Sequence, residues 1–172
     1  MEANARSARL DTVAARPLAE LLDCPPAAGS LLGRSAETVI VEAGDTVFRQ
    51  GEGCRGLYVV VSGTFLRRMQ RMNTRLALSP VRAGDLVELA AALGDGIHTY
   101  TLSGQTSGSL LMLPIENLRR AFQVYPPLRM RLLEELAREV SRAYLAGSMA
   151  RPVMRQRRAR EQSGSNTAFG GR

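Results

Sequence analysis

One stretch of the sequence, GDLVELAAALGDGIHTY from Gly84 to Tyr100, has the outline of a loop that wraps a phosphate group. A Gly-Asp turn comes first, followed by small residues that could begin a helix, a second glycine turn and a strand. Backbone N–H groups at the start of a helix bind phosphate well. The stretch holds no Arg or Lys, although the chain has 23 basic residues, so the usual charged partner of a phosphate is missing.

Other residue types that commonly serve in catalysis or metal binding are rare in this chain. The chain has one histidine, His98, and two cysteines, Cys24 and Cys54, which are too few and too far apart in sequence to indicate a zinc or iron–sulfur site. Each cysteine is interpreted as a small buried hydrophobe or an incidental thiol. There is no Gly-Lys-Ser/Thr phosphate loop, no Gly-x-Ser-x-Gly motif and no carboxylate pair in a glycine-rich setting. The sequence therefore predicts no catalytic residue, no metal and no enzyme activity.

Length and charge bound the class of protein. A chain of 172 residues with 45% hydrophobic residues is expected to fold as one domain with an appendage. No apolar run approaches the ~20 residues of a membrane span, and the first residues lack the apolar stretch of a secretion signal. We therefore expect a cytoplasmic protein with no membrane segment. Of the net charge of +7, most comes from the last residues, where six Arg face one Glu.

The pattern of residues divides the chain into three parts. Residues 1–36 form an N-terminal segment in which short helices are expected over Pro17–Leu22 and Ala27–Arg34, with Pro17 at the first helical position. Residues 37–146 begin with β-formers punctuated by frequent glycine turns, a spacing typical of a sandwich or barrel. Residues 147–172 read as a basic, disordered tail.

The second half of the middle part is predicted to be helical. A short helix is expected over Ile115–Phe122, and a long one runs from Leu128 to a natural stop at Gly147. Apolar residues recur on one face of this long helix at helical spacing. A homodimer seam is predicted along this stripe, through Leu132, Leu136, Val140 and Ala143.

Two stretches resemble a known family. VEAGDTVFRQGEGCRGLYVVVSG, residues 41–63, resembles the opening of cyclic-nucleotide-binding domains of the catabolite activator protein family, and LMLPIENLRRAFQVYPPLRMRLLEELARE resembles their last strand and C-terminal helices. The resemblance covers about residues 37–146. It implies a mainly β fold with helices, in which an antiparallel β-roll of the jelly-roll type is flanked by short N-terminal helices and a long C-terminal dimerisation helix.

The resemblance also implies a phosphate-binding cassette, whose pattern is Gly-Asp, two residues, Gly-Glu, a small-residue helix start, a turn and Arg-Ser/Thr-Ala. Laid on the chain without gaps, Glu88 stands at the Gly and Leu89 at the ribose-binding Glu, while His98 stands at the Arg. A one-residue shift would bring Glu88 to the Glu position, but needs a deletion. A pocket that still binds a ligand would use the following residues: Gly84, Glu88, Leu89, Ala90, Ala91, His98 and Thr99.

The replaced cassette leaves several functions open. We expect a stand-alone, non-catalytic regulatory module whose pocket is vestigial or adapted to another ligand, and which signals by contacting a partner protein. The alternative is a receptor that binds a cyclic mono- or dinucleotide in a different mode. His98 would then act only when protonated, which its reference pKa of ~6.5 disfavours at neutral pH, so a polar strand residue is the simpler interpretation.

Nucleic-acid binding is the weakest of the alternatives. The residues after Gly147 have no apolar periodicity from which a recognition helix could be built, so no sequence-specific DNA binding is expected. Arginines of the tail could contact phosphates or other anions without specificity, at Arg151, Arg155, Arg157 and Arg158.

Overall fold

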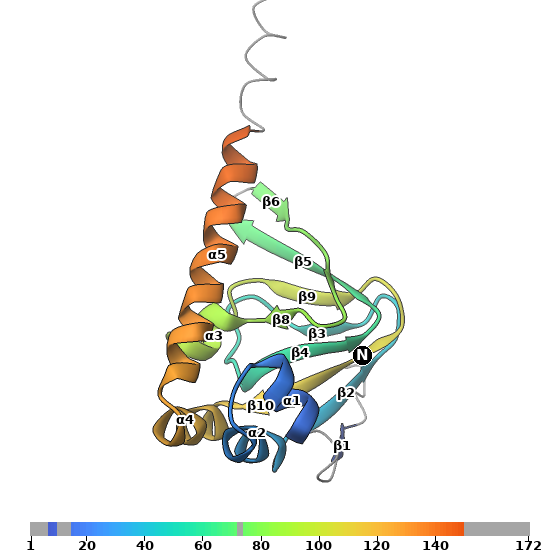
Figure 1. Ribbon diagram of the computed structural model, residues 1–172. Helices are drawn as coiled ribbons and strands as arrows, with labels where there is room; N and C mark the ends of the chain where they lie inside the picture. The colour runs from blue at the N-terminus through green and yellow to red at the C-terminus, as the bar shows by residue number, and fades with distance from the viewer. Residues whose placement is uncertain (1–6, 10–14, 72–73, 150–172) are drawn as a thin grey trace, which may run out of the picture. The chain divides into compact units, whose positions relative to one another are not determined.

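The computed structural model describes residues 7–9, 15–71 and 74–149, in which antiparallel strands form two sheets (Figure 1). The first sheet has the order β1-β2-β10-β4-β8. Its strands are β1 (Ser7–Arg9), β2 (Glu37–Val41), β10 (Gly108–Pro114), β4 (Gly56–Ser62) and β8 (Leu86–Val87). The second sheet has the order β3-β9-β5-β6, with β7 paired to β5. Its strands are β3 (Thr46–Phe48), β9 (Thr101–Gly104), β5 (Thr64–Arg71), β6 (Thr74–Ala77) and β7 (Val81–Arg82).

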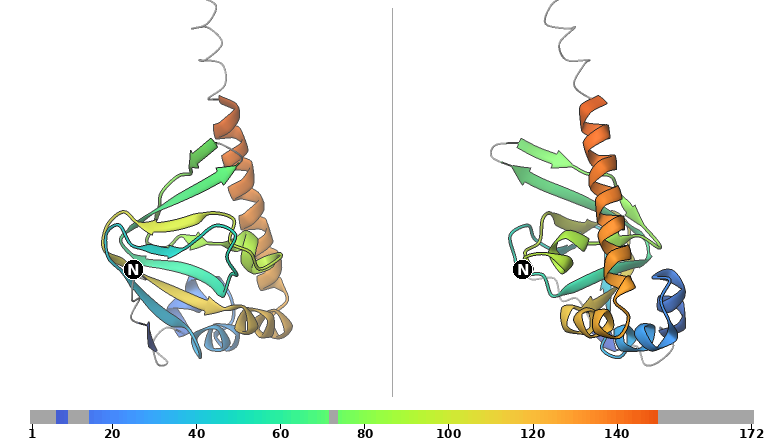
Figure 2. Two further views of the ribbon diagram at one scale, coloured as in Figure 1. Left: turned by 180° about the vertical axis from the view of Figure 1, so that it is seen from behind. Right: turned by 60° about the vertical axis from the view of Figure 1, so that its left-hand side comes forward.

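The helices of the described residues are α1 (Ala15–Leu21), α2 (Pro26–Gly33), α3 (Leu89–Leu93), α4 (Ile115–Val124) and α5 (Pro127–Met149). Helices α2 and α4 contact β10, and α1 packs against α2 (Figures 1 and 2). The chain divides into two compact units, residues 1–136 and 137–172, and α5 contributes to both.

The central strands β4 and β10 bury both of their faces. Alternate residues of a strand point to opposite faces, and here Leu57 and Val59 of β4 join the core cluster that includes the helices. Tyr58 and Val60 join a second cluster, between the sheets. The apolar run GLYVV, residues 56–60, therefore follows from a strand whose first five residues are all buried.

The mainly β fold with a C-terminal helix is confirmed, but three local expectations were wrong. The N-terminal segment contributes β1, which pairs with β2 and was not expected. Helix α1 begins at Ala15, so that Pro17 is its third residue. Helix α5 passes through Gly147 and ends at Met149, because one glycine costs a helix only about 1 kcal/mol relative to alanine.

In the part of the chain that the structure describes, no helix combines the length and the apolar character that crossing a membrane requires.

The close approach of β4 to β10 predicts that Gly56 tolerates no side chain. A Cβ atom at Gly56 would lie 2.2 Å from the carbonyl oxygen of Leu113 and 2.7 Å from the sulfur of Met112. We expect Gly56→Ala to lower the free energy of unfolding by about 1–3 kcal/mol, as overpacking of a core does, measured by urea denaturation. Gly53→Ala is the control, since a Cβ there meets nothing within 4 Å, and an equal loss in both variants would contradict the explanation.

Candidate functional site

The stretch from Gly84 to Tyr100 folds as a turn, β8, α3 and a second turn that leads to β9. Gly84 has a φ of +92°, in the left-handed region that favours glycine. The carboxylate of Asp85 accepts a hydrogen bond of 2.8 Å from the N–H of Arg82 and closes the first turn. This turn places the residue after β8, Glu88, directly before α3.

Glu88 is buried in an unusual backbone conformation. Its φ is +69°, which is costly for a residue with a side chain, and it is 2% exposed. Its N–H donates to the hydroxyl of Tyr100 at 3.0 Å. The carboxylate accepts hydrogen bonds from the N–H and the hydroxyl of Thr99, at 3.3 and 3.2 Å. Groups from the far end of the loop therefore hold the Glu88 carboxylate inward.

His98 lies against this carboxylate. Its Nδ1 is 3.4 Å from Oε2 of Glu88, and both side chains are almost fully buried. The imidazole stacks on the ring of Phe48, with 3.8 Å between centroids and 3° between planes. Nδ1 has no hydrogen-bond partner among the described residues, so its contact with Glu88 is an ion pair when the ring is protonated.

Cys54 completes the buried group through a pairing of two loops. The N–H of Cys54 donates to the carbonyl of Gly96 at 2.7 Å, and the N–H of His98 donates to the carbonyl of Glu52 at 2.9 Å. The buried thiol of Cys54 donates to the carbonyl of Gly56 at 3.1 Å. One side-chain ligand atom from each of Cys54, Glu88 and His98 lies within 4.8 Å of the others. Sequence reasoning missed Cys54, because only the loop pairing brings it to His98.

The surroundings of His98 change its protonation. Burial of the ring disfavours the charged form and lowers the pKa, but the side chains of Cys54 and Glu88 interact more favourably with the imidazolium and outweigh burial. Together they raise the pKa of His98 to about 9. The reference value of ~6.5 therefore does not apply to His98 in this fold, and the shift favours the protonated ring at neutral pH.

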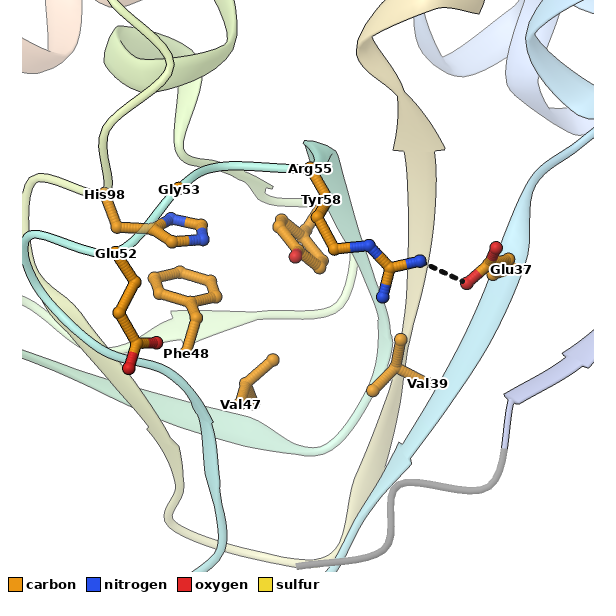
Figure 3. A pocket seen from close by; sticks show the side chains of 9 residues that line it. All are labelled: Glu37, Val39, Val47, Phe48, Glu52, Gly53, Arg55, Tyr58 and His98. Atoms are coloured by element: carbon orange, nitrogen blue, oxygen red, sulfur yellow. Dashed lines mark hydrogen bonds and ion pairs between the residues drawn. The ribbon is translucent and has the colours of Figure 1, made fainter. Parts of the chain in front are cut away.

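A cavity of about 220 Å³ opens beside this group (Figure 3). The His98 and Phe48 rings stand on one side of it, and Arg55, with its guanidinium 3.3 Å from a carboxylate oxygen of Glu37, stands on the other. Burial raises the pKa of the intervening Tyr58 to about 12, so the phenol stays neutral. The lining residues are Glu37, Val39, Val47, Phe48, Glu52, Gly53, Arg55, Tyr58 and His98.

A family model for the cyclic nucleotide-binding domain matches residues 38–125, just over half of the chain. The chain belongs to the cyclic nucleotide-binding domain family. A comparison with curated proteins gives no match.

Solved structures agree with this fold. The sensor domain of the transcriptional regulator DNR from Pseudomonas aeruginosa has a TM-score of 0.63 at 21% identity, over 76% of this chain and 93% of that one. The catabolite activator protein of Thermus thermophilus has a TM-score of 0.63 at 22% identity, over 76% of this chain and 59% of that one. The regulatory domain of Toxoplasma gondii PKA, solved with cAMP, has a TM-score of 0.63 at 14% identity, over 72% of this chain and 48% of that one.

In this cyclic nucleotide-binding domain, the predicted ligand-binding residues do not all lie at the cavity. Of that set, His98 alone is among the residues that line the cavity. Leu89 is 2% exposed and packs in the core cluster that includes the helices, and Ala91 is buried while Ala90 is half-buried. The side chain that faces His98 and Thr99 is Glu88. The sequence analysis did not predict Arg55 as a cavity residue. Its only indication in the sequence is that it lies within residues 41–63, the stretch that resembles the family.

The predicted dimer residues also differ from one another. Leu132 is 3% exposed and belongs to the core of residues 1–136, and Leu136 packs partly against the same core. Val140 and Ala143, in the second unit, are exposed. The tail arginines Arg151, Arg155, Arg157 and Arg158 lie outside the described residues.

The single histidine makes the raised pKa measurable. In a buffer with chelator, we expect the NMR signals of the His98 ring to titrate with a midpoint near 9, well above the ~6.5 of an unfolded histidine. Because the folded state holds the proton more tightly, the resulting stabilisation is fully present below pH ~6.5 and is lost as the pH rises through about 9.

The matched variant for this effect is His98→Gln. Its melting temperature should fall less than that of the wild type between pH 6.5 and 9.5. A His98 midpoint at or below 6.5 would contradict the assignment of an imidazolium beside Glu88.

Proposed function

We propose that this domain is a non-catalytic regulatory module whose pocket has departed from cyclic-nucleotide binding, and that it signals as a homodimer through contacts with a partner protein. The observation that carries the proposal is the buried contact between Glu88 and His98, 3.4 Å apart. This contact lies where the resemblance expects the arginine that binds the phosphate.

The contact leaves His98 poorly suited to bind a phosphate. Its positive charge already has a carboxylate beside it, and its ring is held against Phe48 with 2% of the side chain exposed. An arginine offers a planar fork of donors to a phosphate, whereas an imidazolium offers single donors. A ligand phosphate would therefore have to displace Glu88 to reach the charge.

The position of Glu88 supports the shifted reading of the cassette. Glu88 directly precedes α3, as the ribose-binding Glu precedes the small-residue helix in the family pattern. In this reading Thr99 takes the Ser/Thr position of the family pattern. The charged group that has been lost is the arginine of that pattern, in whose place His98 stands. A hydrogen bond to a charged group is worth about 1.5–3 kcal/mol, so this loss weakens binding by roughly 10- to 150-fold.

The cavity also argues for a different ligand. Its volume of about 220 Å³ lies below the ~300–1,000 Å³ of typical small-molecule sites. Aromatic rings and valines form most of its surface between the polar ends, as Figure 3 shows. An occupant smaller and more apolar than a nucleotide would suit this lining.

Calorimetry tests the proposal directly. We expect the wild type to show no binding of cAMP or cGMP at micromolar concentrations. His98→Arg restores the phosphate fork beside the retained Glu88 and should raise the affinity at least about tenfold. His98→Gln, which removes the charge without supplying a fork, should show no gain.

Two results would contradict this reading of the site. Micromolar binding of cAMP by the wild type would favour the alternative function, a second-messenger receptor, for which Arg55 at the edge of the cavity supplies the specific support. Loss of that binding in Arg55→Gln, and not in Arg119→Gln, would then assign the anion to Arg55. The control is matched, because Arg119 is also an exposed arginine paired with a glutamate.

The homodimer is proposed on the exposed apolar residues of the second unit. Val140, Tyr144 and Leu145 are 60%, 76% and 57% exposed. Val140 and Tyr144 are four residues apart, on one helical face. Pairing with the same face of a second copy would remove these side chains from water.

Disrupting this face should change the oligomeric state. We expect the wild type to be a dimer at tens of micromolar by multi-angle light scattering and Val140→Asp to be a monomer, since a buried unpaired carboxylate strongly opposes association. Val124→Asp is the control, because Val124 is 57% exposed, close to the 60% of Val140, but lies on α4. A monomeric wild type would refute the proposed seam.

Several expectations from the sequence stay predictions. These are the cytoplasmic location, the lack of enzyme activity, the lack of sequence-specific DNA binding and the nonspecific role of the tail.

A further inference from the structure

The buried group formed by Cys54, Glu88 and His98 has the composition of a metal site. A thiol, a carboxylate and an imidazole are the three side-chain types that bind zinc in proteins. Their ligand atoms lie within 4.8 Å of one another, and all three residues are buried. They come from three separate places in the chain. Cys54 lies in the loop before β4, Glu88 directly before α3, and His98 in the turn before β9.

A second observation points to a missing ligand at the same place. Nδ1 of His98 is buried and makes no hydrogen bond with the described residues, although Oε2 of Glu88 lies 3.4 Å away. Its ring is 2% exposed and cannot turn toward water, because it stacks on Phe48. A buried polar atom without a partner is costly, and a bound cation would give this nitrogen one.

We propose that Cys54, Glu88 and His98 bind one zinc ion, through a thiolate, a carboxylate and a neutral imidazole. This inference goes beyond the proposed regulatory function and does not depend on it.

The spacing of two of the ligands already fits. Zinc bonds of ~2.0–2.1 Å to nitrogen and oxygen place two tetrahedral ligands roughly 3.3–3.4 Å apart. Nδ1 of His98 and Oε2 of Glu88 are 3.4 Å apart. The sulfur of Cys54 has to approach, giving up the hydrogen bond of its thiol to the carbonyl of Gly56.

The charges balance without help from solvent. A thiolate and a carboxylate together cancel the charge of Zn²⁺, so the buried site is neutral, as burial requires. Three protein ligands leave one position of a tetrahedral site open. His98 borders the cavity, so a water molecule that enters the cavity is the natural fourth ligand.

Neighbouring groups hold the ligands in place. The N–H and hydroxyl of Thr99 bind the carboxylate of Glu88, and the paired loops fix the backbone of Cys54 and His98. Hydrogen bonds of this kind orient the ligands of natural metal sites.

The experiment uses the full chain, reduced and freed of metal with a chelator, at pH 8. Co²⁺ is titrated first as a spectroscopic probe for zinc. One equivalent should produce a thiolate-to-cobalt charge-transfer band and the intense visible bands of a tetrahedral site. Zn²⁺ should displace the cobalt, and X-ray absorption of the zinc form should give one sulfur at ~2.3 Å with nitrogen and oxygen ligands at ~2.0–2.2 Å.

The two cysteines provide a matched pair of variants. Cys54→Ser should lose the charge-transfer band, whereas Cys24→Ser should keep it. Loss of a residue that only supports a ligand costs a metal site about 10- to 100-fold, so Glu88→Gln and His98→Gln, which change ligands, should weaken zinc binding by at least that much, measured against a chromophoric chelator. Circular dichroism of each metal-free variant checks that it is folded, and the X-ray absorption result on the wild type stands without any variant.

Three results would overturn the proposal. They are no stoichiometric binding of Co²⁺ or Zn²⁺ by the wild type, a bound metal with no sulfur ligand, and a charge-transfer band that survives in Cys54→Ser. Calorimetry with cyclic nucleotides measures a different event, so failure of the zinc site and failure of the proposed function are told apart.

Discussion

Burial of β4 and β10 on both faces is the constraint on which the rest of this domain depends. Residues of these two strands alternate between a core shared with the helices and a core between the sheets. Each core therefore covers one face of the buried part of these strands, which is apolar on both sides. The close packing of the two strands also restricts the residue type at Gly56, where β4 runs so close to β10 that no Cβ fits.

The same constraint sets the position of the site. Cys54 lies two residues before the start of β4, and Tyr58, within β4, borders the cavity. Because β4 is fixed by its packing, the loop that precedes it can serve as a rigid edge for the loop of residues 96–98. His98 then stacks on Phe48, a residue of the core between the sheets. The cavity wall is therefore an extension of the hydrophobic core.

Glu88 combines two features that cost stability, a left-handed backbone and a buried carboxylate. Each is normally avoided, and such features persist where the surrounding structure holds them. Here the hydroxyl of Tyr100, both donors of Thr99 and the ring of His98 surround the residue. Burial alone would lower the pKa of His98, but hydrogen bonding and charge interaction with the side chains of Cys54 and Glu88 raise it. A site built in this way is suited to a ligand that can replace a proton, and a metal cation is such a ligand.

The sequence by itself predicted the β strands and the C-terminal helix, because strand alternation, glycine turns and helical periodicity are local patterns. The β-roll and the reading of the cassette came from the resemblance to cyclic-nucleotide-binding domains. The sequence did not determine β1, whose three residues take their structure from pairing with β2. Nor did it separate Leu132, in the core, from Val140, exposed on the same helical stripe, since periodicity states which face is apolar and not what covers it. The tertiary structure alone brought Cys54 to Glu88 and His98 and turned Arg55 to the cavity. The physical reason is that these contacts join loops far apart in the chain, whose positions follow from the packing of the sheets and from no pattern in the loops themselves.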